Sequence, residues 1–241
     1  MEIGIIGATG KAGRLIAKEA GRRGHHITAI VRDRSKVKNP DWDILESDIF
    51  DLTAEKLEGF HVVVDAFGTP YGKGLEFQHQ TSMLTLINAL ENLSGVRLMV
   101  VGGAGSLYTD SDRKTKVVDQ APPMDQAVSV HMARAFAFLK DSRVNWTYFS
   151  PARDFDPAGS GTGTYQLGTD YVILNEEGKS YLSYRDSALA MVDEIENGRF
   201  IRKQFTAVSG RNIAVENFTI RTKKMEFISR MIHGIKNWKI P

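Results

Sequence analysis

Short apolar runs alternate with amphipathic stretches along most of this 241-residue chain. The runs are rich in Val and Ile, which is typical of strands buried on both faces of a parallel sheet. The stretches between them repeat apolar residues every three or four positions, which predicts helices. Strands are expected at 3–6, 26–31, 44–46, 62–66, 97–101 and 146–149, and helices at 11–23, 54–57, 76–92 and 124–140. This alternation predicts the α/β class with a doubly wound parallel sheet and right-handed crossovers.

The C-terminal part of the chain is less regular. Polar residues and glycines predict loops at 108–123 and 156–163, and the second loop would cover a site. Short strands around a turn at 176–178, then a helix and a last strand, are expected at 165–174, 180–183, 185–196 and 204–208. No repeat or internal boundary divides residues 1–211, so we expect them to form a single domain.

Residues 212–241 form a basic amphipathic C-terminal extension of that domain. Their apolar residues recur at intervals of three and four from Met225 to Trp238, between Lys and Arg. Such a stripe fits a helix packed on its own domain or on a second subunit, as in a homodimer. It also fits a helix on a membrane surface or an acidic partner, and a poorly ordered end is the third interpretation.

Composition narrows the classes of function. The chain has a net charge of +2, but residues 212–241 hold six Lys or Arg and two Glu, which leaves the body slightly negative. We therefore expect no nucleic acid partner for the body. The absence of Cys excludes disulfides, thiolate metal ligands and a cysteine nucleophile, and we expect no metal site. With a core strand directly after Met1 and Glu2 and no apolar run of membrane-spanning length, we expect a cytoplasmic protein.

The first strand runs into the sequence Gly-Ala-Thr-Gly-Lys-Ala-Gly, with glycines at 7, 10 and 13. Gly7 would let the chain leave the strand in a tight turn, and Gly10 would let a diphosphate approach the backbone. Gly13 would let the following helix pack closely on the strand. The start of that helix presents free N–H groups and the positive end of its dipole. This context predicts that the turn binds the pyrophosphate of a dinucleotide.

Several motifs in order resemble the atypical short-chain dehydrogenase/reductases. They are the glycine turn, Val-Arg-Asp after the second strand, Gly-Gly-Ala-Gly-Ser-Leu after the fifth, and Trp-Thr-Tyr-x-Ser-Pro-Ala at the sixth. Within that superfamily the chain is most similar to the bacterial group described as NADH-flavin reductases. NmrA-like proteins and biliverdin reductase B are more distant relatives. The resemblance covers residues 1 to about 210 and implies an NAD(P)-binding Rossmann domain.

The resemblance also implies where a cofactor would lie. It places the pyrophosphate at Gly7, Thr9, Gly10, Lys11 and Ala12, the adenosine ribose at Arg32, the adenine at Asp48 and Ile49, the ribose wall at Ala66, Phe67 and Gly68, and further contacts at Gly102 and Pro151. NADP enzymes usually place Arg against the 2′-phosphate, whereas NAD enzymes place a carboxylate at the ribose. Arg32 therefore favours NADP, and the adjacent Asp33 leaves NAD open.

The usual catalytic pair of the superfamily is missing. Typical members carry Tyr-x-x-x-Lys, in which the lysine lowers the pKa of a tyrosine that transfers the carbonyl proton. None of the seven tyrosines here is followed by Lys four residues later. A flavin or quinone-like acceptor removes that requirement, because it takes hydride directly when it is well positioned. We therefore expect an NAD(P)H-dependent reductase of such acceptors, with Ser106 and His131 as candidate polar contacts.

Two alternatives remain open. NmrA-like relatives bind a nicotinamide dinucleotide without turnover and act as redox-sensing regulators, and such a protein would also lack the Tyr-Lys pair. A sugar-nucleotide epimerase or dehydratase would retain that pair and usually carries a larger C-terminal domain.

Overall fold

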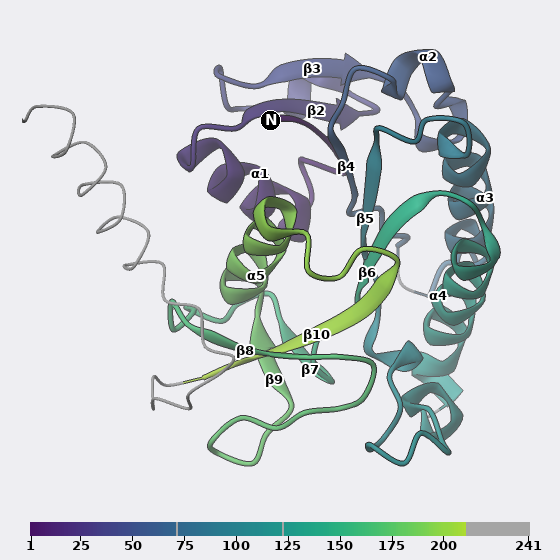
Figure 1. Ribbon diagram of the computed structural model, residues 1–241, viewed down its shortest axis with the longest axis vertical. Coiled ribbons are helices and arrows are strands. Elements are labelled where there is room, and N and C mark those ends of the chain that lie inside the picture. The colour runs from purple at the N-terminus through teal and green to yellow at the C-terminus, as the bar shows by residue number, and fades with distance from the viewer. Residues whose placement is uncertain (71, 122, 211–241) are drawn as a thin grey trace, which may run out of the picture.

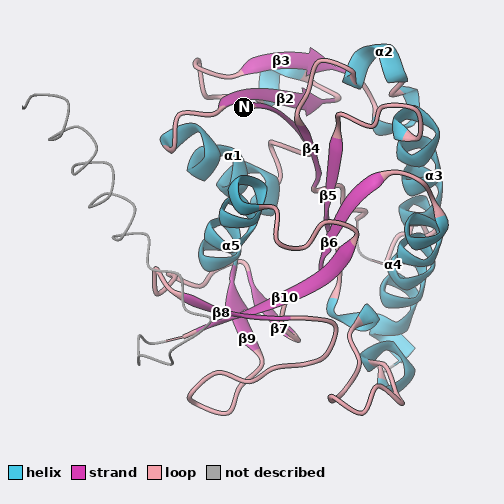
Figure 2. Ribbon diagram, viewed as in Figure 1, coloured by secondary structure: helices cyan, strands magenta, loops and turns pink. Residues whose placement is uncertain are grey.

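The computed structural model describes residues 1–70, 72–121 and 123–210, whose strands form one large sheet and one small one (Figures 1 and 2). The large sheet contains β1 (Glu2–Ile6), β2 (His26–Val31), β3 (Asp43–Glu46), β4 (Val62–Asp65), β5 (Arg97–Val101), β6 (Asn145–Phe149), β8 (Tyr165–Gly168) and β10 (Lys203–Ser209). Their order across the sheet is β3-β2-β1-β4-β5-β6-β10-β8. The chain thus winds from β1 to one edge and then from β4 toward the other, as in Rossmann folds.

All neighbours in this sheet are parallel except β8, which runs antiparallel to β10. At the centre, β1 pairs with β2 and β4, and the side chains of Ile3 and Ile5 are fully buried. Apolar residues fill both faces of the parallel strands, as a sheet covered on both sides requires. The doubly wound parallel sheet predicted from the sequence is confirmed.

Helices cover the two faces of the sheet (Figure 1). One face carries α1 (Lys11–Arg22) and α5 (Tyr184–Asn197), which pack against each other. The opposite face carries α2 (Ala54–Leu57), α3 (Gln78–Leu90) and α4 (Pro123–Asp141). Each face has its own apolar core.

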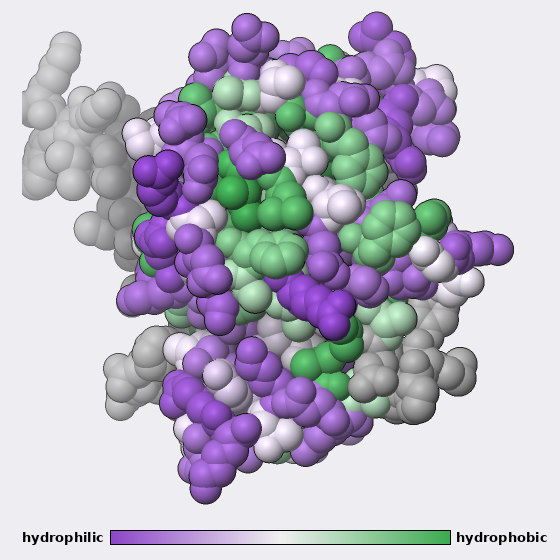
Figure 3. Space-filling model, turned by 90° about the vertical axis from the view of Figure 1, so that its right-hand side faces the viewer, coloured by the Kyte–Doolittle hydropathy of each residue, from purple (hydrophilic) through white to green (hydrophobic). Residues whose placement is uncertain are grey.

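The side of the molecule toward the α3 and α4 layer shows apolar patches among polar ones in Figure 3. Leu84 on α3 and Phe138 on α4 are each more than a third exposed. An apolar surface of this kind is also found on many monomeric proteins. The homodimer considered above stays a prediction.

The C-terminal part differs most from the sequence-based expectation. The small sheet pairs β7 (Asp154–Asp156) in parallel with β9 (Tyr181–Ser183), and β7 was not predicted. Three residues with one apolar side chain carry too little periodicity to indicate a strand. The strand expected at 165–174 ends at Gly168, and it pairs with β10 rather than with the strand beyond the turn at 176–178. The expected loop at 108–123 contains a 3-10 turn, η4 (Val117–Gln120).

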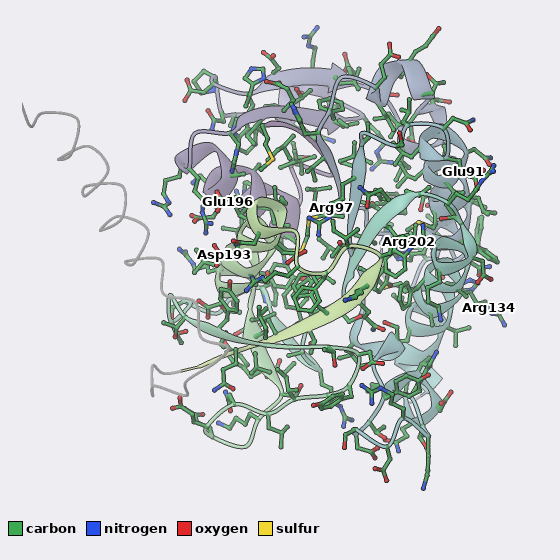
Figure 4. The ribbon with its side chains drawn as sticks, in the orientation of Figure 1. Glu91, Arg97, Arg134, Asp193, Glu196 and Arg202 are labelled. Atoms are coloured by element: carbon green, nitrogen blue, oxygen red, sulfur yellow. The ribbon has the colours of Figure 1, made fainter. Side chains whose placement is uncertain are left out.

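Buried charges attach α5 to the rest of the domain, as the labelled side chains in Figure 4 show. The guanidinium of Arg23, at the end of α1, lies 2.5 Å from Asp193 and 2.8 Å from Glu196. On β5, Arg97 pairs with the fully buried Glu194 and donates to the hydroxyl of Thr147. Breaking such a buried pair on one side leaves an uncompensated charge, which costs about 3–5 kcal/mol. These contacts fix the last helix against the first βα unit.

The basic extension predicted at 212–241 lies outside the described residues, so its interpretations stay predictions. Among the residues that the structure describes, no helix is long and apolar enough to cross a membrane.

Candidate nucleotide site

The glycine turn between β1 and α1 is as tight as the sequence predicts. Gly7 has φ +71, and a Cβ added there would lie 2.7 Å from the carbonyl oxygen of Ala66. A Cβ on Gly13 would lie 2.4 Å from the carbonyl oxygen of Gly7. Only glycine therefore fits both positions. The turn brings the N-terminus of α1, which has no acidic residue in its first turn, to the carboxyl end of the sheet and makes a site suited to a phosphate.

A cleft of about 660 Å³ opens above this turn. It lies at the carboxyl ends of β1, β2, β4 and β5, where the winding of the sheet reverses and where open α/β sheets bind ligands. Twelve of the thirteen residues that the family resemblance indicates line it: Gly7, Thr9, Gly10, Lys11, Ala12, Arg32, Asp48, Ile49, Ala66, Phe67, Gly68 and Gly102. The structure thus brings together residues from five separate segments of the chain.

The part of the cleft where the family resemblance places the ribose is basic. Exposed Arg32 and Lys36 both line it, together with Asp33. The carboxylate of Asp33 accepts hydrogen bonds from the backbone and hydroxyl of Ser35, at 3.0 and 2.6 Å, and caps the 3-10 turn η1 (Arg34–Lys36). These bonds and nearby Lys36 hold the pKa of Asp33 below its usual range. Asp33 thus makes its hydrogen bonds within its own turn. Of the two residues, Arg32 is therefore the one whose side chain is more available to a ligand.

A second short turn, η2 (Ile49–Asp51), lies where the family resemblance places the adenine. Asp48 caps it by accepting from the N–H of Phe50 at 3.2 Å, and buried Ile49 lines the cleft. The ring of Phe67, on the facing loop, stands edge-on to Phe50 at 6.1 Å. These contacts fix the positions of Ile49 and Phe67, which both line the cleft.

Sequence reasoning missed the opposite end of the cleft. Its lining comes from three helices and a strand: His79 on α3, Val128 and Met132 on α4, Phe155 on β7 and Tyr184 at the start of α5. Phe155 and Tyr184 pack ring to ring, with centroids 4.0 Å apart. The spacing of apolar residues at 128 and 132 was the available signal. The other residues are far apart in sequence, and only the fold brings them to the same cleft.

His79 is the one imidazole that lines the cleft among the described residues. Its ring stands edge-on to Phe67 at 5.6 Å, and its Nε2 lies 3.4 Å from the hydroxyl of Thr69. Burial lowers the pKa of His79, with a further decrease from the nearby His131. His79 is therefore neutral at physiological pH and can donate or accept a hydrogen bond there.

Three of the predicted site residues lie elsewhere. Ser106 is buried, and its hydroxyl bonds the carbonyl of Gly103 at 3.0 Å and the hydroxyl of Ser150 at 2.8 Å. His131 lies on the right helix, but its Nδ1 contacts Gln80 at 2.5 Å, because the neighbouring residue Met132 takes the position facing the cleft. Pro151 is buried and does not line the cleft either. Ser106 instead lines a second cleft.

No group of three or more His, Cys, Asp or Glu within residues 1–70, 72–121 and 123–210 is placed to hold a metal ion.

The comparisons with known proteins agree with this geometry. A model of the NAD(P)H-binding family matches residues 7–197, and the chain belongs to that family. It is thus a nicotinamide dinucleotide-binding Rossmann protein of the atypical short-chain dehydrogenase/reductase type.

Individual relatives cover most of the chain. YwnB of Bacillus subtilis is 46% identical over 213 residues, which are 87% of this chain and 99% of YwnB. The Streptococcus pneumoniae protein named as a “putative NADH-flavin reductase” is 37% identical, with a TM-score of 0.82 over 87% of this chain and 99% of that one. The Escherichia coli anaerobilin reductase ChuY, at 16% identity and a TM-score of 0.67 over 89% of this chain and 100% of ChuY, shares the fold.

Proposed function

We propose that this protein is an NAD(P)H-dependent reductase that passes hydride to a flavin or quinone-like acceptor. The observation that carries the proposal is the mainly apolar and aromatic far end of the nucleotide cleft. There Met132 from one face of the sheet and Phe155 and Tyr184 from the other enclose a space beside the ribose wall. The name given to the Streptococcus pneumoniae relative, “putative NADH-flavin reductase”, supports the same class of acceptor.

The cofactor end would be served by the residues that line the cleft. The N–H groups around Gly10, Lys11 and Ala12 would bind the pyrophosphate, and no side chain at Gly10 stands in its way. Arg32 would pair with a 2′-phosphate, which favours NADP over NAD. A bound reduced nicotinamide would supply the hydride.

The protein residues at the acceptor end position a ring and exclude water. Met132, Phe155 and Tyr184 offer flat or adaptable apolar surfaces, which suit a planar conjugated ring. His79 and Thr69 would supply hydrogen bonds to its polar edge. Holding two rings in contact accounts for most of the catalysis that a hydride transfer of this kind needs. The proton that completes the reduction would come from water, because His79 is neutral and buried.

A regulator that binds the dinucleotide without turnover is the second candidate. Two observations favour it. Ser106 is tied to Gly103 and Ser150, and His131 is tied to Gln80, so neither group is free to act on a substrate in the cleft.

A turnover assay separates the two functions. Purified protein is mixed with NADPH and either FMN or a benzoquinone, and the absorbance of NADPH is followed. Sustained oxidation that depends on the protein supports the reductase, whereas tight NADPH binding without oxidation of either acceptor supports the regulator.

A pair of variants then tests the acceptor end. Phe155→Ala removes one wall, and we expect a several-fold higher KM for the acceptor with unchanged NADPH affinity. Phe138→Ala is the matched control, because Phe138 is exposed on α4 and lines neither of the clefts described here. Equal effects of both substitutions would place the acceptor elsewhere.

A further inference from the structure

A second cleft, of about 600 Å³, lies on the α4 side of the sheet. It opens between the C-terminal half of α4, the start of β10 and the segment that follows β5, and shares no lining residue with the nucleotide cleft. One acidic side chain, Asp170, lines it, against six cationic ones: Arg113, Lys116, Lys140, Arg199, Arg202 and Lys203. These cations come from three separate segments of the chain, so the fold gathers them.

The cations are only partly compensated. Asp170 pairs with Arg113 at 2.9 Å. Arg199 lies 3.6 Å from Glu194, whose carboxylate is already paired with buried Arg97. A concave surface lined by one sign of charge concentrates the electrostatic potential and attracts counter-ions. The cleft is therefore suited to a ligand with several negative charges.

Two of these arginines have strained backbones. Arg202 has φ +52 and Arg113 has φ +55, and they are the non-glycine residues with positive φ in the part of the chain that the structure describes. Such conformations cost about 1–3 kcal/mol and cluster at ligand-binding sites. Both of them lie at the same cleft, although 89 positions separate them in the sequence.

Arg202, labelled in Figure 4, directly precedes β10, and hydrogen bonds orient its side chain. Its guanidinium donates to the carbonyl oxygens of Val144 and Ser142, at 2.8 and 3.0 Å, just beyond the end of α4. These oxygens carry only partial negative charge, so they orient the guanidinium without neutralising it. Lys203, the next residue, is exposed at the start of β10.

Aromatic side chains form the inner wall of this cleft. Phe136 stands edge-on to Trp146 at 5.6 Å, and Phe200 lines the cleft beside them. The Nζ of Lys140 lies 5.3 Å from the centre of the Phe136 ring, and that of Lys116 lies 5.5 Å from the centre of Tyr108. The cleft thus combines apolar surface with positive charge.

We propose that this cleft binds a small organic anion that carries at least two negative charges, as phosphoryl or carboxylate groups. The anionic groups lie against Arg202, Lys203 and Lys116, and the organic part lies on Phe136 and Phe200. The ligand occupies this cleft while the nucleotide cleft is filled, because the two clefts have separate linings. The proposal does not depend on the acceptor that the protein reduces.

The test is a calorimetric titration of pyrophosphate, and separately of citrate, into protein saturated with NADP⁺ at an ionic strength of about 0.15 M. The variant Lys116→Gln with Lys203→Gln removes two cations of the cleft, and we expect at least about tenfold weaker binding. The control, Lys18→Gln with Lys38→Gln, changes the net charge equally at exposed positions away from the cleft and should bind as the original protein does.

Neither double variant changes a residue that lines the nucleotide cleft, so the difference between them reports on the second cleft. Tighter binding of pyrophosphate than of citrate assigns phosphoryl chemistry, and the reverse order assigns carboxylates. Absence of binding by the original protein, or equal weakening in the two double variants, overturns the proposal. Circular dichroism of each variant confirms that any loss does not come from unfolding.

Discussion

Asp65 ends β4 with a carboxyl group that is only 5% exposed, directly before Ala66 and Phe67, which line the nucleotide cleft. It accepts one hydrogen bond from the N–H of Phe67 at 3.0 Å, and no salt bridge reaches it within the described ranges. Burial raises the pKa of Asp65 from its ordinary value of 3.8 to about 6, although the bond from Phe67 acts in the opposite direction. The ionised form of this side chain therefore destabilises the folded protein.

The sign and size of the effect follow from proton linkage. Between pH 4 and 6 the unfolded chain ionises at this position while the folded protein keeps its proton, so stability falls as the pH rises. Above both pKa values the cost reaches about 3 kcal/mol, at about 1.4 kcal/mol for each tenfold change in proton affinity. Asp65→Asn keeps the acceptor for Phe67 and removes the charge. We expect the variant to be more stable by up to about 3 kcal/mol near neutral pH and above.

Urea unfolding at about pH 8 and at about pH 4 measures both values, since the pH-dependent gain should vanish at the lower pH. A matched control is Asp41→Asn, at an exposed position where the same change of charge should have little effect at either pH. The reasoning would be refuted by a gain that does not depend on pH, or by a loss of stability near pH 8 in the Asp65 variant.

Four further predictions concern the cleft and the extension. Arg32→Ala should weaken NADPH binding by at least about tenfold while NADH affinity changes little, and equal losses measured by fluorescence titration would contradict a 2′-phosphate contact. Gly10→Val should abolish cofactor binding but preserve the circular dichroism spectrum, because φ −74 at this position suits any residue whereas the branched side chain occupies the space for the phosphates. Ser106→Ala and His131→Ala should each reduce the reductase rate by less than about tenfold, and the rate should vary little between about pH 6 and 8; a thousandfold loss would reveal a missed acid. Truncation after Gly210 should lower solubility or dimerisation if the extension packs on the protein, whereas unchanged assembly with lost liposome binding would indicate a helix on a membrane surface.

Local patterns were sufficient for the first two-thirds of the fold. The buried strands β1, β2, β4 and β5 are short apolar runs that contain Val or Ile. The glycine spacing was enough to predict the turn, because Gly7 and Gly13 occupy positions where a Cβ would clash. The same reasoning missed β7 and extended β8 beyond its end at Gly168, because pairing partners far away in the sequence decide the structure there.

The sequence was also sufficient to predict most of the residues that line the nucleotide cleft next to β1, β2, β3 and β4, because each of these segments follows a strand of the sheet. The sequence did not predict the lining that comes from α3, α4, β7 and α5. His131 was chosen on α4 although the helix turns Val128 and Met132 toward the cleft, and a phase difference of one residue is about 100° around a helix. No local sequence pattern placed His79, Phe155 and Tyr184 at this cleft, because their shared position depends on how α3, β7 and α5 pack.

The ion pairs of Arg23 also bear on how the protein is made. Arg23 and Asp193 are 170 residues apart, so at roughly 5–20 residues per second a ribosome needs about 9–34 s to add the partner. During this interval the β1-α1-β2 unit has been synthesised without α5, which covers its apolar face in the finished domain. Newly made chains that stop before residue 193 should therefore bind chaperones that recognise exposed apolar segments, and full-length chains should release them.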